Sequence, residues 1–95
     1  MPTLNPGPGV EITQEKVIAA ASLTEGASHD EYMTHLVDVE FADAKIKGDV
    51  DGIVEIDAIT GNKVTLKGRV LSSGNAMSNL KTEINKPVQV IARGY

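Results

Sequence analysis

The amino-acid sequence predicts a mainly β domain of the α+β class, and three observations support that prediction. Apolar residues recur at every second position in several segments, which is typical of half-buried strands. Glycines, prolines and asparagines separate these segments. The 95 residues contain no cysteine and no tryptophan, so the core must consist mainly of small aliphatic side chains. We expect a small antiparallel sheet, barrel or sandwich around a hairpin at residues 53–71, with one or two short helices and an extended N-terminal arm.

The hairpin carries the clearest pattern in the sequence. Its strands alternate apolar and polar residues, and the apolar set is Val54, Ile56, Ala58, Val64, Leu66 and Val70. Pairing Ala58 with Leu66, and so Val54 with Val70, brings both strands' apolar residues onto one face. On the other face this register places Asp57 opposite Lys67 and Glu55 opposite Arg69, pairs that each contribute about 0.2–1 kcal/mol. The register implies a three-residue connection, Gly61-Asn62-Lys63.

The chain has the length of one domain, with an arm at residues 1–12 and a single compact β-rich unit at residues 13–95. Residues 1–9 hold three of the four prolines and two glycines, so they cannot form a helix or a central strand. We expect the arm to dock on a neighbouring subunit, and the alternative is that it lies on its own domain. The expected interface residues are Leu4, Pro6, Pro8 and Val10.

Two segments after the arm favour short helices. Residues 13–25 have Thr13 as an N-cap, an alanine-rich middle and Gly26 as a C-terminal stop. Apolar residues at 17, 19, 21 and 23 also alternate, so the sequence leaves helix and strand open for 14–25. Ser28 and Glu31 match a capping box, which predicts a helical turn through Tyr32 and His35.

The remaining segments read mainly as strands. Residues 36–41 predict a strand with Val37, Val39 and Phe41 on one face. The apolar phase then changes from odd to even numbers, which predicts a bulge near Ala42-Asp43. Asp51-Gly52 predicts a tight turn into the hairpin. After a loop at 72–79, residues 80–84 fit a helical turn or a short strand, and a final strand follows Pro87.

The charges are unevenly distributed along the chain, although the formal net charge is only −4. Ten acidic residues and two lysines lie between Glu25 and Asp57, a formal charge of −8. From Ala58 to Tyr95 one acid stands against six basic residues, a formal charge of +5. We expect these opposite charges to pair across neighbouring strands rather than to mark a nucleic-acid surface. The basic half also lacks the interleaved aromatic residues of single-strand binders.

The sequence contains no pattern that predicts catalysis, a cofactor or a defined metal site. His29 and His35 flank Asp30 and Glu31, but their spacing fits no usual pair of metal ligands on one helix face. Four acids surround Gly52, namely Asp49, Asp51, Glu55 and Asp57. An EF-hand with Gly52 at its sixth position would begin at Lys47, which is not a ligand, so only an irregular calcium cluster stays open. No cysteine or serine arrangement indicates nucleophilic catalysis.

These observations favour a role in binding other molecules over a role in catalysis. The leading hypothesis is a non-enzymatic structural or assembly subunit that clamps neighbouring subunits in a repeating, homo-oligomeric assembly through its arm; a virion, for example as a capsid decoration protein, is one such setting. The alternatives are a small barrel or sandwich that binds a small ligand or peptide, and a small enzyme using His29, His35 and nearby acids. No apolar run reaches the length of a membrane span and no secretion signal is visible, so we expect cytoplasmic synthesis.

Overall fold

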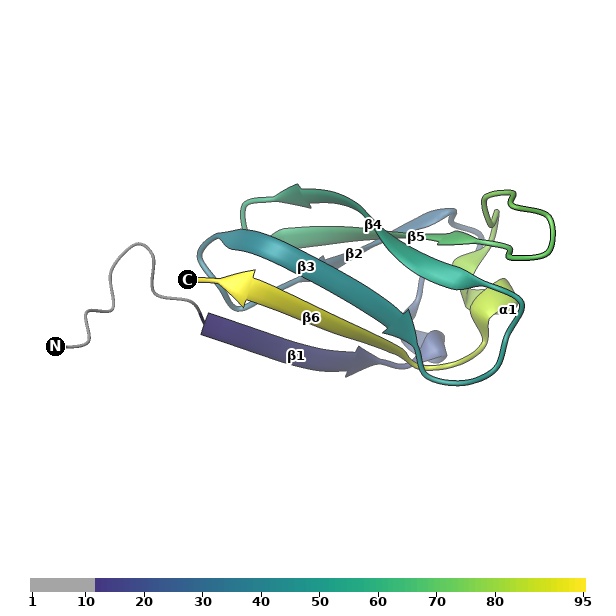
Figure 1. Cartoon of the computed structure of the whole chain (residues 1–95), viewed down its shortest axis with the longest axis horizontal. Helices are drawn as coiled ribbons and strands as arrows, with labels where there is room; N and C mark the ends of the chain where they lie inside the picture. The colour runs from purple at the N-terminus through teal and green to yellow at the C-terminus, as the bar shows by residue number, and fades with distance from the viewer. Residues whose placement is uncertain (1–11) are drawn as a thin grey trace, which may run out of the picture.

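The computed structural model describes residues 12–95, with side chains from residue 14 onward. The protein is mainly β, and its six strands form two three-stranded antiparallel sheets stacked as a sandwich (Figure 1). Sheet A has the order β1 (Ile12–Ile18), β6 (Val88–Gly94) and β3 (Val39–Ile46). Sheet B has the order β2 (His29–Met33), β5 (Lys63–Arg69) and β4 (Ile53–Thr60). The predicted fold class is confirmed.

The core lies between the inner faces of the two sheets. Alternate residues of the central strands are almost completely buried: Val88, Val90 and Ala92 from β6, and Val64 and Leu66 from β5. One end is covered by the short helix α1 (Leu80–Ile84) and by Met77. Leu80, Ile84 and Met77 are also buried. Small aliphatic residues therefore supply most of the core, as the composition predicts.

The two long sides of the sandwich differ. On one side β3 and β4 run close together, and residues 47–52 carry the chain from the first strand to the second (Figure 1). On the other side β1 and β2 are the edge strands, and each pairs with only one neighbour in its sheet. This second side is the open side of the sandwich, and the name is kept below.

The predicted helix at 13–25 is wrong. The segment forms β1, then a single 3-10 turn at Ala20–Ser22. Pairing with β6 along its whole length satisfies the backbone of β1 on one side, and this tertiary contact overrides the local signal for a helix start at Thr13. The inner face consists of the even residues Gln14, Lys16 and Ile18, because these lie opposite Ala92, Val90 and Val88. Val17 lies on the outer face and is half exposed.

The predicted helical turn at Ser28–His35 is also wrong, because residues 29–33 form β2. The Ser28 hydroxyl is 2.9 Å from Nδ1 of His29 and does not cap a helix. Tyr32 pairs with Val64 of β5, and both side chains are buried in the core. The gain from burying the tyrosine ring therefore outweighs a capping pattern worth about 1 kcal/mol.

The phase change in β3 is real, but it lies two residues earlier than predicted. The register with β6 shifts between Val39 and Phe41, so Glu40 is the extra residue of a bulge. Val39 consequently points into the core, whereas Phe41 is 54% exposed. Val37, predicted on the same buried face, precedes the strand and is 79% exposed. Ala42, Ala44 and Ile46 pack against the core, as the even-numbered phase predicts.

The central hairpin forms, but its register and loop differ from the prediction. Thr60 pairs with Lys63, so the loop has two residues, Gly61-Asn62, and Gly61 adopts a positive φ of 60°. A second irregularity between Ile56 and Ala58 makes Asp57 a bulge residue. The predicted pairings of Ala58 with Leu66 and Val54 with Val70 are therefore replaced by Ile56 with Leu66 and Val54 with Gly68.

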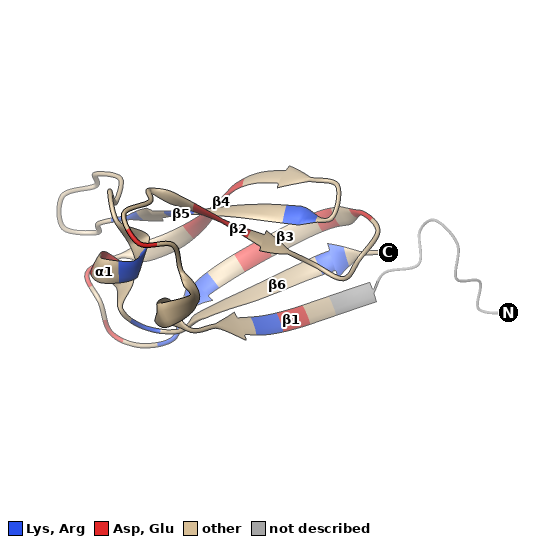
Figure 2. Cartoon of the chain, turned by 180° about the vertical axis from the view of Figure 1, so that it is seen from behind, with Lys and Arg blue, Asp and Glu red and all other residues tan. Residues whose placement is uncertain are grey.

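The expected charge pairing is confirmed despite the shifted register. Arg69 contacts Glu55 at 3.1 Å and Lys67 contacts Asp57 at 3.5 Å, the two pairs predicted for the hairpin. Lys63 with Glu31 and Lys81 with Glu25 follow the same rule. Each lysine or arginine pair found within residues 12–95 thus joins the acidic segment to the basic one. Figure 2 shows acidic and basic residues interspersed over the strands rather than gathered at one end.

The connections show why the remaining segments fold as they do. Asp51-Gly52 belongs to the crossing from sheet A to sheet B rather than to the predicted tight turn, and the Asp51 carboxylate accepts a bond from Ser72 N–H at 3.0 Å. Residues 80–84 are helical because the Asn79 side chain caps Thr82 N–H and Glu83 caps the first backbone groups in return. The final strand after Pro87 is confirmed as β6. Within residues 12–95, no helix is long and apolar enough to cross a membrane.

Candidate binding site between the two sheets

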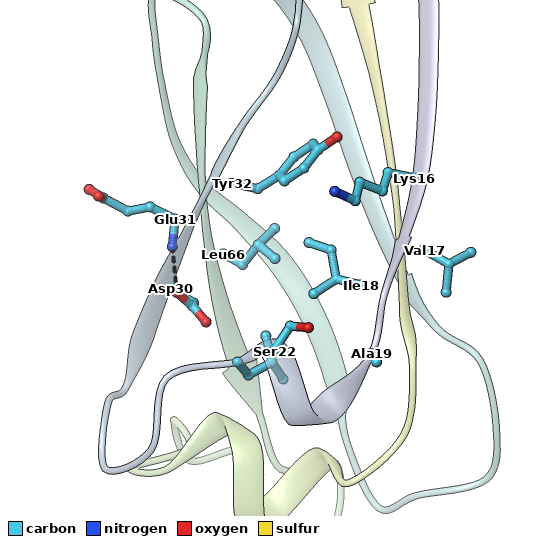
Figure 3. Close-up of a pocket in the computed structure, with 10 residues that line it drawn as sticks. Lys16, Val17, Ile18, Ala19, Ser22, Asp30, Glu31, Tyr32 and Leu66 are labelled. Carbon is cyan, nitrogen blue, oxygen red and sulfur yellow. Dashed lines mark hydrogen bonds between the residues drawn. The ribbon is translucent and has the colours of Figure 1, made fainter.

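The open side of the sandwich contains a pocket of about 330 Å³. Its walls come from the end of β1, the 3-10 turn, β2 and Leu66 of β5 (Figure 3). The apolar lining consists of Ile18, Ala19, Leu23, Leu66 and the ring of Tyr32, and the polar lining includes Lys16, Ser22 and Asp30. A cavity of about 150 Å³ accommodates a benzene-sized group, so this pocket has room for roughly two.

Two charged side chains stand on opposite walls of the pocket, and both point inward from edge strands. Lys16 lies opposite the buried Val90, and Asp30 lies opposite the buried Leu66, so each faces the interior of the sandwich. Inward-pointing charges on edge strands disfavour indiscriminate pairing with other sheets. The pocket therefore combines an apolar floor with one cationic and one anionic group.

Asp30 and Lys16 have different surroundings. The carboxylate of Asp30 accepts bonds from Thr24 N–H at 2.8 Å and from the Thr24 hydroxyl at 3.1 Å, which fixes the turn that leads into β2. Lys16 Nζ lies 5.7 Å from the centre of the Tyr32 ring, within the range of a cation–π contact. The Asp30 carboxylate is thus already hydrogen-bonded to Thr24, whereas the Lys16 ammonium contacts the ring of Tyr32.

Tyr32 forms one wall of the pocket with its ring. The residue is only 8% exposed, and its hydroxyl is buried with no hydrogen-bond partner among the described residues. In Figure 3 the hydroxyl points past Lys16, away from Asp30 and Ser22. Burial raises the pKa of the Tyr32 phenol, so the group stays protonated and is a hydrogen-bond donor at neutral pH.

The histidines considered from the sequence do not come together. His29 Nε2 lies 3.5 Å from Asp57 on the outer face of sheet B. The backbone N–H of His35 donates to Gln14 Oε1 at 2.8 Å, beyond the other end of β2. Among residues 12–95, no group of three histidines and acids has the geometry of a metal site.

Three of the four acids around Gly52 are engaged by partners of their own. Asp51 binds Ser72, Glu55 binds Arg69, and Asp57 lies beside Lys67 and His29. The expected interface residues Leu4, Pro6, Pro8 and Val10 lie outside the described residues.

A second candidate surface is the outer face of sheet A. Residues that alternate with the buried ones form it: Glu15, Val17, Phe41, Asp43, Lys45, Gln89, Ile91 and Arg93. Phe41 is more than half exposed, and the guanidinium of Arg93 lies 6.0 Å from its ring centre. Gln89 donates to Glu15 at 3.0 Å, but no ion pair is found among the described side chains of this face.

Sequence reasoning missed Lys16, Tyr32 and the outer face of sheet A for one reason. The assignment of helix to residues 13–25 and 28–35 hid the two edge strands that face each other across the open side. A period of two with Ile12 and Ile18 inside would have placed Lys16 inward, and the charge on an inner position is itself a sign of an edge strand.

No protein-family model matches this chain, and the comparisons with curated proteins and with solved structures likewise find no significant match.

Proposed function

We propose that this protein is a non-enzymatic assembly subunit, which binds neighbouring protein subunits through sheet A and the N-terminal segment that precedes it. The observation that carries the proposal is the contrast between the outer faces of the two sheets. Sheet B bears three of the ion pairs beside its exposed Met33 and Ile53, whereas sheet A presents the aromatic ring of Phe41 next to Arg93, which has no ion pair among residues 14–95. A particle such as a virion is one setting for a subunit of this kind.

The chemistry of sheet A supports a protein partner. Aromatic residues and arginine are enriched in the centres of protein interfaces and supply most of their binding energy. Phe41 is the only phenylalanine of the chain, and it lies at a surface position where it contributes little to the core. β1 is the first strand of the described chain and belongs to sheet A, so residues 1–11 directly precede this sheet in the sequence.

The association state of the purified full chain tests the proposal. Sedimentation equilibrium should show a concentration-dependent oligomer, and Phe41→Ser should weaken association by about tenfold or more. Leu71→Ser is the matched control, because Leu71 is equally exposed at 56% but lies in the loop beyond β5. Circular dichroism checks that both variants fold. A full chain that stays monomeric at all concentrations, alone and with other proteins of its source, would contradict the proposal.

The pocket on the open side favours a second candidate, a module that binds a small amphipathic molecule. The Tyr32 ring and Leu66 offer an apolar surface, and Lys16 offers a cation for an anionic group. The chain has no tryptophan and Tyr32 is one of only two tyrosines, so tyrosine fluorescence of a Tyr95→Phe variant reports on this pocket alone. A saturable change of this fluorescence with an anionic fatty-acid probe, lost in Lys16→Glu but kept in Lys45→Glu, would favour this candidate, because both lysines are exposed and only Lys16 lines the pocket.

A further inference from the structure

The free edge of β1 has a definite polarity, which follows from the ladders of sheet A. Backbone groups alternate sides along a strand. Lys47 N–H donates to Pro87 O at the end of the β3–β6 ladder, so odd residues of β6 bond to β3 and even ones bond to β1. Since even residues of β1 lie opposite even residues of β6, the backbone of Thr13, Glu15 and Val17 faces the free edge.

The side chains of β1 follow the same parity. The even residues point into the sandwich, because they lie opposite the buried residues of β6. A strand added to this edge pairs its own residues with 13, 15 and 17, of which Glu15 and Val17 carry outward side chains. Such a strand must therefore offer free N–H groups at positions with polar or small side chains, and apolar side chains at the positions between them.

The first ten residues of the chain meet both conditions. The even positions hold Pro2, Leu4, Pro6, Pro8 and Val10, which are all apolar. The odd positions hold Thr3, Asn5, Gly7 and Gly9, which are polar or small and keep their N–H groups. The three prolines of the segment thus remove hydrogen-bond donors from one side only, and the opposite side can pair with an edge.

We infer that residues 2–10 of one copy form a fourth strand on the β1 edge of a second copy, with Leu4 directed toward the pocket on the open side. This inference rests on the assembly function proposed above. The nine residues span about 30 Å when extended, and the seven residues of β1 span about 23 Å, so the segment covers the whole edge.

The exchange between two copies is reciprocal and closed. Residues 2–10 run directly into β1, so a two-fold axis near Val10 places Asn5 opposite Glu15 and Leu4 opposite Lys16. Leu4 then lies beside Ile18 and the aliphatic stem of Lys16, which line the pocket. The proline side of the added strand faces outward and resists a fifth strand, which closes this edge contact at two copies.

The same register within one chain requires a short turn. Pairing of Gly7 with Thr13 leaves five residues for it, and the last of these, Ile12, is already paired with Gly94 in β1. In the exchange between copies the chain instead runs extended through residues 8–12 and needs no turn, in agreement with the assembly function proposed above. This comparison is the reason for assigning the segment to a second copy.

Cysteine cross-linking tests the inference in the full chain, which contains no native cysteine. Asn5→Cys and Glu15→Cys are made in separate proteins, mixed and oxidised. Residues directly opposite on paired strands lie about 5.5 Å apart between Cα atoms, within disulfide range. We expect a cross-linked dimer from this mixture. We expect one also from a mixture of Thr3→Cys and Val17→Cys, because the same register places these two residues opposite each other. Leu4→Cys with Glu15→Cys is the control, since the two side chains point to opposite faces.

Four outcomes are distinguishable. Dimers that depend on the parity of the cysteine positions support the inference. A link that forms only within the Asn5→Cys, Glu15→Cys double variant, and as a monomer, places the segment on its own β1 and overturns it. Association without any of these links overturns the inference but leaves the proposed function standing. A chain that never associates removes both.

A matched pair of substitutions tests the apolar face independently. Leu4→Asp should weaken self-association by about tenfold or more, because it places a charge against the pocket lining. Thr3→Asp introduces the same charge one residue earlier, on the outward face, and should change the dissociation constant by less than about threefold. Equal effects of the two variants would contradict the assigned faces.

Discussion

At the scale of single residues, burial decides the energetics far more than charge does. Leu66 is 1% exposed and lies between the sheets, next to the pocket. Its neighbour Lys67 lies on the outer face of sheet B, 3.5 Å from Asp57, with about a third of each side chain exposed. Adjacent residues of one strand thus separate the two kinds of contribution.

Leu66→Ala should lower the free energy of unfolding by about 2–5 kcal/mol, because it opens a cavity in the core. Lys67→Glu should cost less than about 1 kcal/mol, because exposed ion pairs are weak and screened by solvent. Urea denaturation of both variants measures the difference. Equal destabilisation by the two changes would mean that Leu66 does not contribute to the core as described.

Residue-scale reasoning from the sequence recovered the faces of β5 and the charge pairs, but it placed Ala58, which is exposed beyond the bulge, on the core face. Leu66 and Val64 are buried, and Asp57 and Glu55 find the basic partners expected of them. The predicted register was wrong for two reasons. The two-residue loop shifts the pairing by one residue, and the bulge at Asp57 shifts it by one more. Long side chains still reach diagonal partners across a strand pair, so the ion pairs form in either register.

At the scale of elements, tight backbone contacts fix how β6 meets the start of β3. A Cβ atom at Gly94 would collide with the carbonyl oxygen of Asp38 and come within 3.0 Å of Val39 Cα. The same region is held by the Tyr95 N–H, which donates to Asp38 O at 3.1 Å. Glycine at this position is therefore required by the packing of backbone against backbone.

Gly94→Ala should destabilise the protein by about 1–3 kcal/mol or more, because the backbone it meets cannot move aside. Gly52→Ala is the comparison, since its nearest neighbour is the terminal methyl of Met77, which can change rotamer. Thermal unfolding followed by circular dichroism should give the larger fall in Tm for Gly94→Ala. The reverse order would show that the close approach of Asp38 is not rigid.

Glu25 joins the turn before β2 to helix α1 and gives this contact a pH dependence. Bonds from Asn79 Nδ2 at 2.7 Å and the Thr82 hydroxyl at 3.1 Å, with help from Lys81, lower the pKa of Glu25 below its usual value of about 4.5. The folded state therefore favours the charged carboxylate. Its stabilising effect is complete above pH 4.5 and is lost as the pH falls through the lowered pKa.

Glu25→Gln should consequently be less stable than the native protein at pH 7, and the difference should vanish as the pH drops well below 4.5. Denaturant midpoints at a series of pH values measure it. Glu40→Gln is the control, because Glu40 is exposed at the β3 bulge and makes no side-chain bond among the described residues. A difference that persists unchanged at the lowest pH would show that the carboxylate charge is not responsible.

The strand type of β3, β4, β5 and β6 was predictable from the sequence, and that of β1 and β2 was not. β5 and β6 alternate regularly because both of their backbone sides are paired and one face is fully buried. β1 and β2 carry Lys16 and Asp30 on inner positions, so the hydrophobic period is broken where the pocket lies. The candidate site was therefore hidden by the same inward charges that define it.

At the scale of the whole molecule, the described residues contain both sheets and a core between them. Among these residues the buried cluster extends from Leu23 to Ala92, and we expect it to fold without residues 1–9. Deletion of residues 1–9 should therefore leave the urea m-value of the isolated domain nearly unchanged, because the surface exposed on unfolding is the same.

The same deletion should abolish self-association, and stability itself provides the readout. Binding between folded copies stabilises them by mass action, so the unfolding midpoint of the full chain should rise with protein concentration. The midpoint of the shortened chain should not depend on concentration, and its value should match the full chain at high dilution. Pro87→Ala leaves the N-terminal segment intact and serves as a control for the loss of a proline. If the shortened chain kept the full concentration dependence, neighbouring copies would meet through surfaces within residues 10–95, and the exposed Phe41 on sheet A would be the place to look for that contact.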